Sequence, residues 1–124
     1  MEQLGCGYNG KKRILVLEDS PDMLEIYHDL LDSMYELEAV DNCDEGLGLV
    51  EANNICGVIA DVSLRGRGTG LEFLANCGKK VPVIIVTAYG NLYREEAEKR
   101  GAKDYFSKPF DIDKLVSSVE QYFH

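Results

Sequence analysis

The chain has 124 residues, of which 13 are Lys or Arg and 22 are Asp or Glu, so its net charge at pH 7 is −9. This length fits one domain, and a hydrophobic content of 45% with only three prolines excludes disordered and collagen-like chains. The acidic balance argues against a general binder of nucleic acids or anionic membranes, because either would need a basic surface. No apolar run in the sequence approaches the ~20 residues of a membrane-spanning helix.

The beginning of the chain is Gly-rich and polar and lacks the apolar core of a signal peptide. We expect residues 1–12 to be a flexible N-terminal arm or a cloning remnant, and residues 13–124 to form the domain. The four cysteines are Cys6, Cys43, Cys56 and Cys77, without the C-x-x-C spacing of a zinc or redox pair. They favour reduced thiols in a cytoplasmic protein, because a chain with this apolar content does not need disulfides.

Short apolar runs alternate with amphipathic stretches, which is typical of alternating strands and helices. The expected strands cover residues 14–17, 37–40, 57–60, 81–87 and 104–107. The expected helices cover residues 21–34, 44–53, 71–77, 91–100 and 111–123. Ser20 is a suitable N-cap and Pro21 a suitable first residue for the first helix. Five such units predict an α/β fold in which helices cover both faces of a parallel sheet.

Polar side chains follow the expected strands, where an open α/β sheet binds its ligands. They are Glu18 and Asp19 after the first strand, Asp61 after the third, Thr87 and Ala88 at the end of the fourth, and Lys108 and Pro109 after the fifth. Carboxylates at one edge repel each other, since two unit charges about 4 Å apart cost ~4 kcal/mol at an effective dielectric near 20. Such a cluster favours a cation, and a small set of oxygen ligands suits Mg²⁺ completed by a phosphoryl group.

A lysine and a hydroxyl at the same edge suit the oxygens of that phosphoryl group. The residues therefore indicate a site that places a phosphoryl group on a carboxylate, and aspartyl phosphate is a known covalent species of this kind.

Four motifs carry these residues in order along the chain. They are Leu-Glu-Asp-Ser-Pro at 17–21, Ile-Ala-Asp-Val-Ser-Leu at 59–64, Val-Thr-Ala at 86–88 and Phe-Ser-Lys-Pro-Phe at 106–110. With them the chain resembles the receiver domain of response regulators in two-component signalling over about residues 13–124. The resemblance implies a flavodoxin-like doubly wound (βα)5 fold, with a five-stranded parallel sheet in the order 2-1-3-4-5 and helices on both faces.

The resemblance also implies a role for each position. Asp61 would take a phosphoryl group from a sensor histidine kinase or a phosphotransfer protein. Mg²⁺ would be held by Glu18, Asp19, Asp61 and the backbone carbonyl of Ser63. The phosphoryl group would be bound by Thr87, Ala88 and Lys108. Thr87 and Tyr105 would form the switch, the tyrosine filling space that the threonine vacates, and the peptide bond between Lys108 and Pro109 would be cis.

The expected function is that of a phosphorylation-controlled switch in the cytoplasm, which catalyses only its own phosphorylation and dephosphorylation. Its partners would be the kinase and an unknown downstream protein, with no membrane and, for this chain alone, no nucleic acid. One alternative is a degenerate receiver that docks without phosphorylation, against which the acidic residues, Thr87 and Lys108 argue. The other is a flavodoxin-like nucleotide or flavin enzyme, for which the glycines of 65–70 lack a nucleotide-binding spacing.

Overall fold

The computed structural model describes residues 7–8, 11–52, 54–63 and 69–123. Its strands are β1 (Gly7–Tyr8), β2 (Lys11–Leu17), β3 (Tyr35–Val40), β4 (Gly57–Asp61), β5 (Val83–Thr87) and β6 (Asp104–Ser107). Its helices are α1 (Pro21–Leu31), α2 (Cys43–Glu51), α3 (Gly70–Cys77), α4 (Arg94–Lys99) and α5 (Ile112–Tyr122). From β2 onward strands and helices alternate along the chain, as the sequence predicted.

The parallel strands lie in the order β3-β2-β4-β5-β6, with β2, β4 and β5 in the interior of the sheet. Counted from the first long strand this is the order 2-1-3-4-5, so the predicted fold class is confirmed. The register aligns the strand ends: Leu17 lies opposite Ala60, Asp61 opposite Val86, and Thr87 opposite Ser107. The residues that follow the strands are therefore brought to one edge of the sheet.

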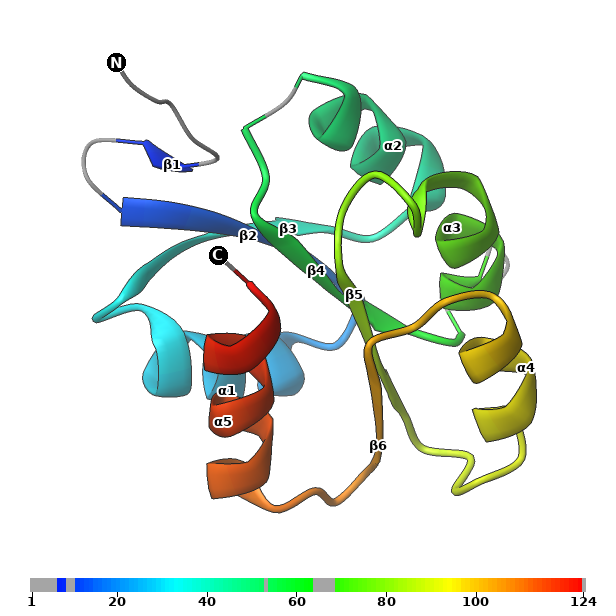
Figure 1. Cartoon of the computed structure of the whole chain (residues 1–124). Helices are drawn as coiled ribbons and strands as arrows, with labels where there is room; N and C mark the ends of the chain where they lie inside the picture. Colours follow the sequence, from blue (N-terminus) through cyan, green and yellow to red (C-terminus); the bar gives the residue numbers. More distant parts are fainter. Residues whose placement is uncertain (1–6, 9–10, 53, 64–68, 124) are drawn as a thin grey trace.

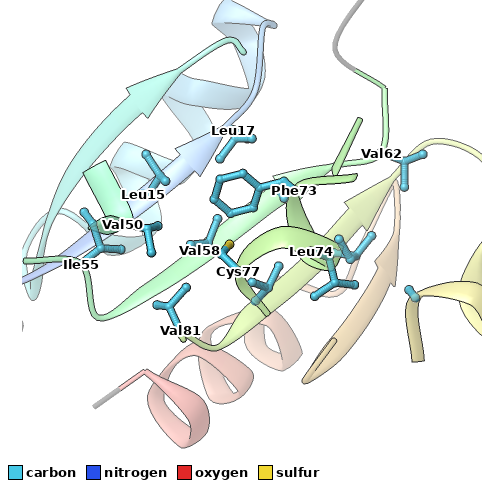
Figure 2. Close-up of a cluster of buried hydrophobic side chains, with 14 of the residues drawn as sticks. Leu15, Leu17, Val50, Ile55, Val58, Val62, Phe73, Leu74, Cys77 and Val81 are labelled. Atoms are coloured by element: carbon cyan, nitrogen blue, oxygen red, sulfur yellow. The ribbon is translucent and has the colours of Figure 1, made fainter. Parts of the chain in front are cut away.

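Helices cover both faces of this sheet, α1 and α5 on one face and α2, α3 and α4 on the other (Figure 1). The side chains of β2 alternate between these faces, so that Leu15 and Leu17 join one core and Ile14 and Val16 the other. Figure 2 shows the first of these cores, in which Phe73 of α3 lies over the sheet. Burial of each such side chain contributes roughly 1.5–3 kcal/mol, so the two cores fix the sheet and its edge.

The helices begin where polar side chains cap them. The side chains of Ser20, Asn42, Thr69 and Asp111 accept hydrogen bonds from backbone N–H groups in the first turns of α1, α2, α3 and α5. For α4 the described residues provide no such side-chain cap, and this helix is shorter than the expected 91–100. None of the helices in the described ranges is both long and apolar enough to cross a membrane.

The beginning of the chain differs from the expectation for residues 1–12. Gly7–Tyr8 pairs antiparallel with Lys11–Lys12, so the described part of this segment belongs to the sheet, while residues 1–6 and 9–10 lie outside the described residues. The thiols differ as well, since Cys43 and Cys77 are free but Cys56 takes part in a disulfide. The expectation of reduced cysteines is thus wrong for Cys56. Most of the glycine-rich loop at 65–70 also lies outside the described residues.

Candidate phosphoacceptor site

Two acidic side chains and one lysine meet at the carboxyl edge of the sheet. Asp61 is the last residue of β4 and is only 9% exposed, and Glu18, directly after β2, is 3% exposed. The Nζ atom of Lys108 donates hydrogen bonds to Asp61 Oδ2 at 2.8 Å and to Glu18 Oε1 at 3.1 Å. The structure therefore brings together three of the residues that the sequence singled out.

The second oxygen of each carboxylate is held by the backbone. The Ser63 N–H donates to Asp61 Oδ1 at 3.0 Å, and the Ser20 N–H donates to Glu18 Oε2 at 3.2 Å. Each carboxylate thus accepts one bond from a backbone amide and one from the same ammonium. Bonds of this kind stabilise the charged form and fix the direction of the oxygens.

The site still carries an electrostatic cost. Burial raises the pKa of Glu18 and the nearby charge of Asp61 adds to the effect, although Lys108 opposes it. Burial alone would lower the pKa of Lys108, but the hydrogen bond to Asp61 and the charges of both carboxylates together raise it. Perturbed pKa values within one group of residues are frequent at functional sites.

The expected metal ligands are only partly assembled. Within the part of the chain that the structure describes, no three His, Cys, Asp or Glu side chains are placed to hold a metal ion. The ammonium of Lys108 is instead the cation between Glu18 and Asp61, and Asp19, the next residue after Glu18, is half-buried. Closely spaced carboxylate oxygens are hard donors that suit Mg²⁺, so the donor chemistry of the site fits this ion.

The end of β5 supplies a hydroxyl next to the lysine. Thr87 is fully buried, its Oγ1 accepts a hydrogen bond from the Tyr89 N–H at 3.1 Å, and its carbonyl accepts one from the Lys108 N–H at 2.7 Å. The latter bond places Lys108 beside Thr87 at the sheet edge. Ala88 is exposed directly after the strand, and the peptide bond between Lys108 and Pro109 is cis.

Tyr105 lies inside the fold, with only 3% of its surface exposed. Its hydroxyl donates to the Gly90 carbonyl at 2.7 Å and accepts from the Tyr93 N–H at 3.3 Å. The guanidinium of Arg94 lies 4.8 Å from the ring centre and donates to the Tyr105 carbonyl at 3.4 Å. The ring is therefore already buried while the Thr87 hydroxyl is bonded to Tyr89. Sequence reasoning missed Arg94, because no spacing in the chain links it to Tyr105.

These geometric features define a doubly wound α/β domain with an acidic, lysine-containing site at its carboxyl edge. A sequence profile of the response regulator receiver domain matches residues 14–120. The chain therefore belongs to the response regulator receiver domain family of two-component systems, as its motifs indicated.

Individual relatives agree with this assignment. The chain is 32% identical over 114 residues to the nitrogen assimilation regulatory protein NtrX of Azorhizobium caulinodans, covering 87% of this chain and 25% of that protein. It is similar to the crystal structure of the receiver domain of NtrX from Brucella abortus, with a TM-score of 0.77, 30% identity and coverage of 87% and 95%. A CheY-like receiver from Methanospirillum hungatei gives a TM-score of 0.79 at 27% identity, with coverage of 90% and 92%. The chain thus spans about a quarter of the curated NtrX protein.

Proposed function

We propose that Asp61 is the phosphoacceptor of a two-component phosphorelay. The observation that carries this proposal is the placement of Asp61, whose two oxygens are held by Lys108 Nζ at 2.8 Å and by the Ser63 N–H at 3.0 Å. A carboxylate fixed in this way at an open edge of the sheet can act as a nucleophile. The donor would be the phosphohistidine of a sensor histidine kinase or of a phosphotransfer protein.

The transfer forms a bond between an Asp61 carboxylate oxygen and phosphorus and breaks the bond between phosphorus and the donor's imidazole nitrogen. Mg²⁺, held by Glu18, Asp19, Asp61 and the Ser63 carbonyl, would neutralise phosphoryl charge when bound. Lys108 would move its charge from the carboxylates to a phosphoryl oxygen, and Thr87 with the backbone at Ala88 would bind another. Of these groups, Lys108 Nζ and the backbone of Ser63 already contact Asp61, which supports the assignment.

The same proposal requires two conformations of the domain, one of which is favoured when Asp61 is phosphorylated, because a signal depends on a change of shape. To reach the phosphoryl group, Thr87 Oγ1 would give up its bond from the Tyr89 N–H, which is 3.1 Å long. The segment between Thr87 and α4, against which Tyr105 packs, would then rearrange and present a changed surface to a downstream protein. A cytoplasmic location and the lack of DNA binding by this chain alone stay predictions.

Intact mass measurement tests the acceptor. A small phosphodonor with Mg²⁺ should add one phosphoryl group to the wild type and none to Asp61→Asn. Asp104→Asn is the matched control, because Asp104 lies in β6 and is bonded by Ser118 Oγ at 2.8 Å. Equal mass gain in wild type and Asp61→Asn would contradict the proposal. No gain in either protein would favour a receiver that docks without phosphorylation.

A further inference from the structure

An aromatic contact joins α1 to the segment that carries Lys108. The rings of Tyr27 and Phe110 are nearly parallel, with centres 6.4 Å apart and an interplanar angle of 8°. The rings of Phe110 and Phe106 also pack edge to face, with their centres 6.5 Å apart. Because Phe110 follows Lys108 by two residues, this contact fixes the backbone just beyond the lysine.

The same segment borders a cavity of about 380 Å³ together with α1. Its lining consists of Met23, Ile26, Lys108, Pro109, Phe110 and Ile112. Two of these residues are substantially exposed, Ile26 at 40% and Ile112 at 51%. Because part of the segment faces this cavity, its position depends on the ring contacts of Phe110 with Tyr27 and Phe106.

Tyr27 is also close to the site electrostatically. The side chain is buried, with only 1% of its surface exposed. Burial is the largest cause of its raised pKa, and the charges of Glu18 and Asp61 raise it further. Its ring belongs to the core cluster that contains Ile14 and Ile59 of the sheet, and it also stacks on Phe110 of the Lys108 segment.

We propose that Tyr27 is a positioning residue for phosphoryl transfer, which stacks on Phe110 and thereby holds Lys108 Nζ on Asp61. This inference rests on the proposed phosphoacceptor function of Asp61. On this proposal, Tyr27 acts on the reaction through its stack with Phe110 and the position of Lys108.

A tyrosine in a core can also serve packing alone, and the chain offers a matched comparison. Tyr35 belongs to the same apolar cluster and is 7% exposed. It begins β3 opposite Lys12, at the end of the sheet away from the site. Tyr35→Leu should therefore destabilise the fold without affecting Lys108.

The first experiment measures the initial rate of phosphorylation by a small phosphodonor with Mg²⁺. Tyr27→Leu should slow it about tenfold, since a displacement of about 1 Å in a reacting group can cost up to ~100-fold. Tyr27→Phe retains the ring and should stay within about twofold of the wild type, as should Tyr35→Leu. In a Lys108→Ala background, Tyr27→Leu should change the rate by less than about twofold, because residues that act through one group are not additive.

The second experiment needs no phosphodonor. The ¹⁵N–¹H resonance of the Lys108 ammonium should be the same in wild type, Tyr27→Phe and Tyr35→Leu, and should shift or vanish in Tyr27→Leu. An unchanged resonance in Tyr27→Leu would overturn the inference, as would a full tenfold loss in the Lys108→Ala background or an equal loss in Tyr35→Leu. A wild type that takes up no phosphoryl group would refute the proposed function, while the resonance would still decide whether Tyr27 positions Lys108.

Discussion

The helices α1 and α4 lie on opposite faces of the sheet (Figure 1), and they are capped and packed very differently. α1 has 11 residues, begins at Pro21 with the Ser20 side chain as its cap, and buries Tyr27 and Leu31. α4 has six residues, receives no side-chain cap in the described structure, and has Ala97 as its buried residue.

The difference indicates that the two sides of the domain have different roles. The well-packed α1 side adjoins Glu18 and, through Tyr27, the Lys108 segment, so it keeps the chemical groups in place. The α4 side adjoins Thr87 and Tyr105 and can open at lower free energy, because local stability follows the number of buried contacts. A receiver needs both properties, a fixed reaction site and a surface that responds to it.

The largest expected effect tests this contrast directly. Leu31, the last residue of α1, is fully buried, so Leu31→Ala should lower the free energy of unfolding by about 2–5 kcal/mol. Ala97→Gly removes the buried methyl of α4 and should cost only about 1 kcal/mol, mainly through helix propensity. Urea denaturation with both variants measures the two values. Equal losses would show that the two helices are anchored alike and would remove the basis of the comparison.

The cap of α1 offers a smaller and more local change. The Ser20 hydroxyl accepts a bond from the Met23 N–H at 3.4 Å, so Ser20→Ala should cost about 1 kcal/mol. The Ser20 N–H, which holds Glu18, is a backbone group and stays in this variant. Asn42→Ala at the start of α2 is the control for a cap remote from Lys108. Thermal unfolding should show similar losses for both, and phosphorylation rates near the wild type.

Much of this architecture could be predicted from the sequence. The segments predicted as strands at 57–60 and 104–107 became β4 and β6, and the polar residues after them met at one edge, because parallel strands share their direction. Helix ends were predicted less well. α1 was expected to reach Met34 but ends at Leu31, where the chain turns and leaves Met34 45% exposed. Apolar spacing alone cannot show such a turn, since Met34 continues the helical stripe.

The site was predicted as a set of residues but not as a set of contacts. Strand ends indicated that Glu18, Asp61 and Lys108 would be neighbours, yet the lysine ammonium was expected on a phosphoryl group rather than between the two carboxylates. The stack of Tyr27 on Phe110 joins residues far apart in the chain. Such contacts depend on how helices pack on the sheet, and no local pattern encodes them.

Replacing Glu18 with a neutral side chain is expected to stabilise the fold. The pKa of Glu18 is raised from its ordinary value of 4.5, so the folded state favours the neutral carboxyl. The neutral carboxyl therefore adds to the stability of the fold. This added stability is fully present below pH 4.5 and is lost as the pH rises through the folded-state pKa of Glu18. Glu18→Gln should therefore raise the free energy of unfolding at pH 7 by up to about 1 kcal/mol when Mg²⁺ is absent.

The pH dependence distinguishes this cause from a packing effect. The gain of Glu18→Gln over wild type should shrink as the pH falls through the folded-state pKa of Glu18, which is raised above its ordinary value of 4.5. Glu36→Gln is the control, because Glu36 pairs with Arg13 at 2.9 Å on β3, away from the site. A gain that is independent of pH would show that the burial of a charge is not its source.

The smallest effect on stability is expected at α4, where it also tests whether this side can move. Arg94 lies over the ring of Tyr105 with its side chain 42% exposed, so Arg94→Gln should cost no more than about 0.5 kcal/mol of global stability. The same change removes the cation that holds the start of α4 on β6. Amide hydrogen exchange in α4 should therefore speed up several-fold, while exchange in α1 stays as in the wild type. Arg100→Gln, which loses bonds to Glu96 and to the Leu71 carbonyl at the other end of α4, is the matched control and should leave Tyr105 in place. If Arg94→Gln accelerates exchange in α1 and α4 equally, the two helices open together, and the site and the responsive surface are one cooperative unit.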